Sequence, residues 1–75
     1  MGINIICMAK FCSNSGQEYD INSIAEIEEC LREQIRGFDY LEVAGNHVLI
    51  YHRNDPLGIQ IGKAFGIPEG RKQLK

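Results

Sequence analysis

The segment from Tyr40 to Arg53, YLEVAGNHVLIYHR, constrains the fold of this chain more than any other. Two runs rich in β-branched and aromatic residues flank Gly45-Asn46, a pair that accepts the positive φ angles of a two-residue turn. The sequence therefore predicts a β-hairpin in which Ala44 faces His47. The other cross-strand pairs that follow are Val43 with Val48, Leu41 with Ile50, Tyr40 with Tyr51 and Asp39 with His52.

The two faces of this hairpin differ in character. Because side chains alternate along a strand, one face carries only apolar residues, namely Leu41, Val43, Val48 and Ile50. The opposite face is mixed and carries Tyr40, Glu42, His47, Leu49, Tyr51 and Arg53. Tyrosine and arginine are frequent energetic anchors of protein interfaces, so the mixed face is the first candidate surface for binding a partner.

Seventy-five residues form one small domain, in which folding buries only about 60% of the surface of the chain. The apolar fraction of 44% and the charged fraction of 24% are ordinary for a globular protein. We expect a single α+β domain over residues 1–68, followed by a polar, basic C-terminal tail over 69–75 that is either disordered or folded back. Without a signal-peptide pattern or a long apolar run, the expected location is cytoplasmic, with no membrane partner.

The N-terminal part predicts a strand followed by a turn. Residues 3–12, INIICMAKFC, are apolar at both odd and even positions, as expected for a strand inside a sheet. If 14–16 form a three-residue loop, Phe11 faces Tyr19 and Lys10 faces Asp20 in a hairpin. A plain loop in place of the second strand is the alternative.

A helix is predicted to begin at Ser23, which forms a capping box with Glu26. Apolar residues then recur at helical spacing up to Gly37, a suitable C-cap: Ile24, Ile27, Leu31 and Ile35. The opposite helix face is acidic and comprises Glu26, Glu29 and Glu33. A solvated face is the simplest interpretation, but such a face could also imitate a phosphate backbone, which makes it the second candidate surface.

Residues 54–66 have two interpretations. Asp55-Pro56 is typical of a helix start, and we favour a second helix for that reason. Glycines at every fourth position, 58, 62 and 66, oppose it, because each costs a helix about 1 kcal/mol relative to alanine. The alternative is a strand, since LGIQI alternates with period two and glycine in a strand marks a bulge or a close contact.

Together these elements predict a two-layer α+β sandwich. A small antiparallel sheet of three to four strands would carry two helices on one face, in the order ββαββα, or βαββα if the first hairpin is only a loop.

The sequence contains no convincing pattern for catalysis, a metal or a cofactor. In extended strands Cys7 and Cys12 point to opposite faces, as do His47 and His52, so neither pair converges on a metal. Residues 58–64 contain one residue too few for a phosphate-binding loop. We therefore expect a protein that is not an enzyme, without metal or cofactor.

The leading functional prediction is a small protein-interaction module that docks on another protein or on its own copy. Its candidate contacts are Tyr40, His47, Leu49, Tyr51 and Arg53 on the hairpin and Glu26, Glu29 and Glu33 on the helix. Size and charge suggest an inhibitor or accessory protein of a virus or mobile element. Such a protein would block a nucleic-acid-handling complex, for example a defence nuclease, by docking or by acidic mimicry.

Nucleic-acid binding is the alternative. Residues 1–42 hold three basic and eight acidic side chains, whereas 43–75 hold five basic and two acidic ones. Tyr40 and Tyr51 could stack bases beside the basic side chains of the second half, which are Arg53, Lys63, Arg71, Lys72 and Lys75. The net charge of −2 makes this alternative the weaker one.

Overall fold

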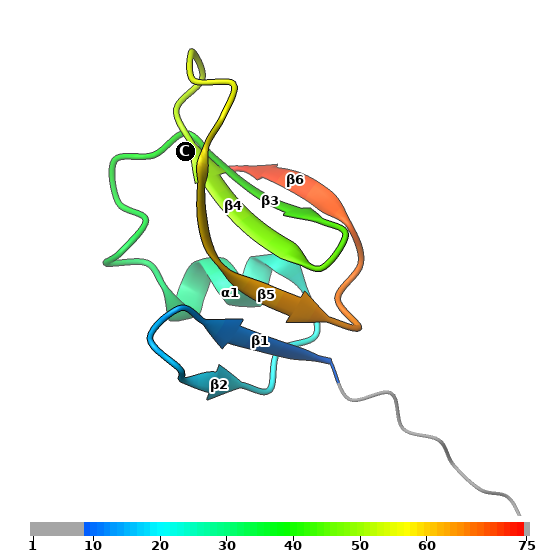
Figure 1. The fold of residues 1–75 in the computed structure, drawn as a ribbon. Coiled ribbons are helices and arrows are strands. Elements are labelled where there is room, and N and C mark those ends of the chain that lie inside the picture. The colour runs from blue at the N-terminus through cyan, green and yellow to red at the C-terminus, as the bar shows by residue number, and fades with distance from the viewer. Residues whose placement is uncertain (1–8, 75) are drawn as a thin grey trace, which may run out of the picture.

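The computed structural model describes residues 9–74, and within them it contains a six-stranded antiparallel sheet and one short helix (Figure 1). The elements are β1 (Lys10–Ser13), β2 (Glu18–Tyr19), α1 (Ile24–Cys30), β3 (Tyr40–Ala44), β4 (His47–Tyr51), β5 (Ile59–Phe65) and β6 (Gly70–Gln73). The strands lie in the order β2-β1-β5-β4-β3-β6. The expected sandwich of three to four strands with two helices is therefore wrong.

The central hairpin is confirmed. Strands β3 and β4 pair in the predicted register, with Ala44 opposite His47 and Tyr40 opposite Tyr51. Gly45 has a φ of 62°, and every residue with a positive φ in the described chain is a glycine. A glycine at the first of the two central positions is the pattern of a II′ turn, which suits the twist of the flanking strands.

The predicted second helix over 56–66 is wrong, because most of this segment is strand β5. Asp55 does cap the backbone, accepting hydrogen bonds from Leu57 N–H at 3.0 Å and Gly58 N–H at 3.5 Å. The chain then turns at Gly58, whose φ is 71°, and continues as a strand. An Asp-Pro start is therefore used here for a loop turn, since the same side-chain hydrogen bonds serve both structures.

Strand β5 lies at the centre of the sheet between β1 and β4. Gly62 packs so closely on β1 that a Cβ atom there would meet the Cys12 carbonyl oxygen and come within 2.7 Å of the Phe11 ring. Val48 faces Gly62 and Leu49 faces Gln60, so Ile61 is the extra residue of a β-bulge. Both features match the strand alternative for this segment.

Helix α1 is shorter than predicted, ending at Cys30 rather than Arg36. Its capping box is present, since Ser23 Oγ accepts from Glu26 N–H at 3.3 Å and Glu26 Oε1 accepts from Asn22 N–H at 2.6 Å. Its last turn carries two glutamates and no basic residue, an arrangement that the helix dipole disfavours. Beyond it, the chain proceeds through turns to Gly37 while Leu31 and Ile35 remain buried.

The first hairpin is also confirmed where the structure describes it. Phe11 faces Tyr19, and their rings stack with centroids 5.8 Å apart. Lys10 forms its ion pair with Glu18 at 3.1 Å rather than with the expected Asp20, and the hydrogen bond that Lys10 donates to Glu18 raises the pKa of Lys10. The predicted strand over 3–12 lies largely outside the described residues, but its described end, β1, does have a neighbouring strand on each side.

The C-terminal segment folds back onto the sheet as β6, which pairs with β3. Glu69 accepts a hydrogen bond from Gly45 N–H at 2.7 Å, and Leu74 N–H donates to the Asp39 carbonyl at 2.9 Å. On the helix side, Lys72 reaches Glu28 of α1 at 3.2 Å. The last strand is thus attached at both of its ends and to the helix.

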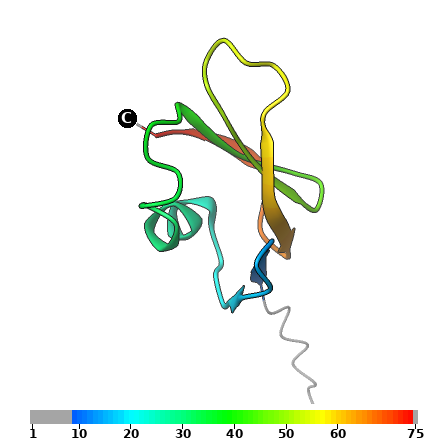
Figure 2. The same ribbon diagram turned by 60° about the vertical axis from the view of Figure 1, so that its left-hand side comes forward.

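The core lies between α1 with its following turns and one face of the sheet. Figure 2 shows α1 on one side of the sheet, with no other helix or strand of the described chain on the opposite side. The buried side chains include all four residues of the apolar hairpin face, Leu41, Val43, Val48 and Ile50. The buried core as a whole comprises Ala9, Phe11, Ile21, Ile27, Leu31, Ile35, Leu41, Val43, Val48, Ile50, Ala64 and Ile67.

Candidate functional site

The outer face of the sheet carries a cluster of two tyrosines, an arginine and a glutamate. Tyr40 and Tyr51 lie side by side on β3 and β4, with ring centroids 5.4 Å apart. Tyr51 donates its hydroxyl hydrogen to Glu42 Oε1 at 3.0 Å. The cluster forms on this face because outward-facing positions on adjacent strands share a register.

Arg71 from β6 completes this cluster. Its guanidinium carbon lies 4.7 Å from the centre of the Tyr40 ring, and Nη1 donates to the Tyr51 hydroxyl at 3.3 Å. The hydrogen bond with Tyr51 is the main cause that raises the pKa of Arg71 above its ordinary value, with smaller contributions from Tyr40 and Glu42. The guanidinium keeps further N–H donors on this face besides the one given to Tyr51.

A groove lies between this cluster and the loop that joins β4 to β5. The loop, residues 52–58, projects beyond the sheet on the end away from α1 (Figures 1 and 2). The groove has a volume of about 560 Å³. Its lining residues are Glu42, Leu49, Tyr51, Arg53, Asn54, Asp55, Pro56, Leu57 and Arg71.

The loop wall of the groove is held at its base by Asp39. The Asp39 carboxylate accepts a hydrogen bond from Arg53 N–H at 2.8 Å and lies 3.8 Å from the Arg53 guanidinium. His52 Nδ1 lies 4.0 Å from the same carboxylate, and its ring stacks on Phe38 with centroids 4.6 Å apart. Asp39 and His52 thus lie close together at the open end of the hairpin, as predicted, and the hydrogen bond from Arg53 N–H to Asp39 holds the base of the loop.

The tip of the loop exposes an apolar side chain. Leu57 is 84% exposed, and it lines the groove together with Pro56 and Leu49. The groove therefore combines an apolar wall with two guanidinium groups, from Arg53 and Arg71. Concave sites with apolar walls and a few polar groups are the usual form of binding sites in proteins.

The structure brings together most of the predicted hairpin contacts. Leu49, Tyr51 and Arg53 line the groove, and Tyr40 lies directly beside Tyr51. His47 does not join them, because it lies at the turn end of β4, opposite Lys63.

The predicted acidic helix face is not continuous in the structure. Glu26 caps the start of α1 and Glu29 is exposed on α1. Glu33 lies beyond the end of α1, 3.6 Å from Arg36. The three carboxylates therefore do not form one stripe of a single helix.

The basic residues of the nucleic-acid alternative are dispersed. Arg71 is engaged by the two tyrosines and Arg53 by Asp39. Lys72 reaches Glu28 on the helix side of the sheet, and Lys75 lies outside the described residues. Lys63 stands opposite His47 on β5. Of the four basic residues that the structure describes, only Arg53 and Arg71 share a surface, which is the groove beside the tyrosine cluster.

The loop side of the groove does not follow from the sequence pattern. The helix predicted from Asp55-Pro56 includes Pro56 and Leu57, whereas the structure places both beside Leu49. Arg71 was expected in a C-terminal tail, and its position beside Tyr40 depends on β6 pairing with β3. One signal in the sequence does point to the loop: Asp55-Pro56 favours a turn of the backbone, whereas the regularly spaced glycines after it oppose a helix.

Comparison with known proteins yields no relative from which a function could be transferred. No protein-family model, no curated protein and no solved structure compared with this chain matches it. Within residues 9–74, no three or more histidine, cysteine or acidic side chains gather where a metal ion could be held. No helix in that range has the length and apolar character needed to cross a membrane.

Proposed function

We propose that this chain is a non-catalytic protein-interaction module that binds another protein in the groove between the outer sheet face and the β4–β5 loop. The observation that carries this proposal is the combination of the exposed Leu57 tip with the tyrosine and arginine cluster beside it. The segment it would bind carries a carboxylate next to a large apolar side chain.

The apolar half of this proposal rests on the loop wall. Single exposed apolar residues are common on protein surfaces and need no explanation. Leu57, however, lines a groove together with Leu49 and Pro56, so a partner side chain inserted there would contact these apolar side chains. Burial at such a position contributes about 25 cal/mol per Å² of apolar surface removed from water.

The acidic half of the proposal rests on the hydrogen-bond donors of Arg71. Both carboxylates in the groove already accept hydrogen bonds within the chain, Glu42 from Tyr51 and Asp55 from two backbone N–H groups. Arg71 keeps N–H donors beyond the one given to Tyr51. A carboxylate of the partner is the group that matches these donors, because arginine binds it with paired, charge-assisted hydrogen bonds.

Docking through this groove is a simpler mechanism than acidic mimicry, since one of the three helix glutamates is used as a cap and another lies past the helix. The proposed biological role is that of a cytoplasmic inhibitor or accessory protein of a virus or mobile element. That role rests only on similarity in size and charge to such proteins.

The test is affinity capture by the tagged chain from a native lysate treated with nuclease, followed by affinity measurements on the purified partner. Leu57→Ser is the test variant, and Phe65→Ser is its matched control, because Phe65 is also exposed but does not line the groove. We expect Leu57→Ser to weaken binding at least tenfold, the effect of losing about 1.4 kcal/mol, and Phe65→Ser to leave it unchanged.

Two outcomes would reject the proposal. One is equal partner affinity of the Leu57→Ser variant and the unaltered chain, with both folded by circular dichroism. The other is capture that disappears on nuclease treatment, which would favour the nucleic-acid alternative; that binding should weaken steeply as salt rises.

A further inference from the structure

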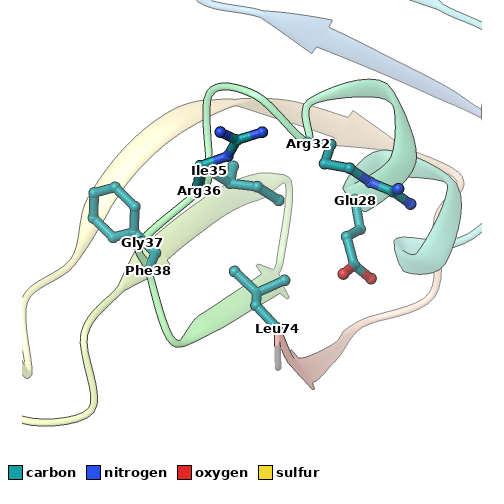
Figure 3. Close-up of a pocket in the computed structure, with 7 residues that line it drawn as sticks. All are labelled: Glu28, Arg32, Ile35, Arg36, Gly37, Phe38 and Leu74. Carbon is teal, nitrogen blue, oxygen red and sulfur yellow. The ribbon is translucent and has the colours of Figure 1, made fainter.

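A second cavity lies on the helix side of the sheet, between α1 with its following turns and the end of β6. Its volume is about 430 Å³. Figure 3 shows the residues that line it, which are Glu28, Arg32, Ile35, Arg36, Gly37, Phe38 and Leu74. The proposed protein-binding groove shares none of these residues, so the two sites are separate.

The inner part of this cavity is apolar. Ile35 is buried in the core, and Phe38 and Leu74 are partly buried against it. Gly37 also lines the cavity. Phe38 is held in place by its stacking on His52. The cavity thus offers a fixed apolar surface that a small molecule could cover.

The rim of the cavity carries two guanidinium groups, from Arg32 and Arg36. Among the described residues, Arg32 has no ion pair or side-chain hydrogen bond. Arg36 has only a 3.6 Å pair with Glu33, in which both side chains are more than 70% exposed, and exposed pairs of this kind contribute little. The one carboxylate on the lining, Glu28, is already neutralised by Lys72 at 3.2 Å.

We propose that this cavity binds a small amphipathic anion, with an aromatic or aliphatic body and one carboxylate, sulfonate or phosphate group. The body covers Ile35, Phe38 and Leu74, and the anionic group is bound by Arg32 and Arg36 at the rim. The volume lies within the range of about 300–1,000 Å³ that is usual for small-molecule sites. Guanidinium groups suit all three anions, because their N–H donors match the spacing of the anion oxygens.

The test uses two probes with the same aromatic body. They are 8-anilinonaphthalene-1-sulfonate, which is anionic, and N-phenyl-1-naphthylamine, which lacks the sulfonate. Fluorescence titration of the full chain should give one site that binds the anionic probe about tenfold more tightly than the neutral one. Amide chemical shifts should move at Gly37, Phe38 and Leu74 when the anionic probe binds.

The double variant Arg32→Gln, Arg36→Gln tests the role of the rim. We expect it to weaken the anionic probe about tenfold and leave the neutral probe unchanged, since each guanidinium contributes a charge-assisted hydrogen bond. Arg53→Gln is the matched control, because Arg53 lies in the other groove, and it should change neither affinity. Thermal melts of each variant establish that the chain is folded.

Three results would overturn the assignment. The first is equal affinity for the two probes, which would leave only a non-specific apolar surface. The second is a set of amide shifts located away from the cavity or an equal response to Arg53→Gln. The third is co-sedimentation with anionic phospholipid vesicles that the double variant loses, because the arginines would then serve a lipid surface.

Discussion

Among the described glycines, Gly62 is the one at which an added side chain would find the least space. Its backbone lies against Cys12 and the Phe11 ring on β1, while it faces Val48 on β4. It is a buried position on the longest strand, and Phe11 beside it is completely buried. A side chain at this position would therefore separate β5 from β1.

We predict that Gly62→Ala strongly destabilises the chain. The added methyl group would meet a backbone carbonyl, which cannot move aside as a flexible side chain can, so the loss should be about 3 kcal/mol or more. Urea unfolding followed by circular dichroism measures this loss.

Gly70→Ala is the matched control, because a Cβ atom at that position would meet nothing within 4 Å. Its effect should stay within about 0.5 kcal/mol. Similar stabilities of the two variants would contradict the packing described for β5.

Helix α1 is an element whose own sequence stabilises it weakly. It has seven residues, fewer than an isolated helix needs to form in water, so most of its stability must come from packing. Ile27 is buried against the sheet, and Lys72 of β6 forms an ion pair with Glu28 of the helix. The local contribution is concentrated in the capping box at its start.

We predict that Ser23→Ala lowers the free energy of unfolding by about 1 kcal/mol, the usual cost of a lost N-cap. Ser23→Asp should retain most of the stability, because a carboxylate can accept the same hydrogen bond from Glu26 N–H. Denaturant unfolding of the three proteins gives the comparison. A loss of equal size in both variants would show that the hydroxyl does not act as a cap.

At the scale of the whole molecule, β6 adds the C-terminal segment to one edge of the sheet. The strand pairs with β3, Glu69 holds the hairpin turn, and Lys72 reaches the helix. A chain of 75 residues buries little surface per residue, so it has little stability to spare. The last strand is therefore part of the fold and not an appendage.

We predict that removing residues 69–75 abolishes cooperative unfolding or lowers the free energy of unfolding by several kcal/mol. The removal would leave β3 as an exposed edge strand and Glu28 without its partner. Thermal melts by circular dichroism measure the effect. Gln73→Ala is the control, since Gln73 is exposed and the substitution should change the stability by about 0.5 kcal/mol at most. A truncated chain that melts as the full one does would contradict this role of β6.

Local signals in the sequence were sufficient for three features of this protein. The turn at Gly45 and the alternation beside it fixed the central hairpin and its register, including the four residues that reach the core. The capping box located the start of α1, and a turn cluster located the pairing of Phe11 with Tyr19. Each of these signals acts between residues that are close in the chain, so the residues alone carry the information.

The remaining features depend on partners that are distant in the sequence. Asp55-Pro56 fits both a helix cap and a loop turn, and the choice of β5 came from Gly62 fitting against β1, about fifty residues earlier. The polar segment 70–73 carries no strand pattern of its own and became a strand by pairing with β3. Both cavities followed from these two choices, because Leu57 lines one beside Arg71 and Leu74 lines the other. Pairing between distant strands is a property of the whole fold, and it cannot be predicted from any short segment of the sequence.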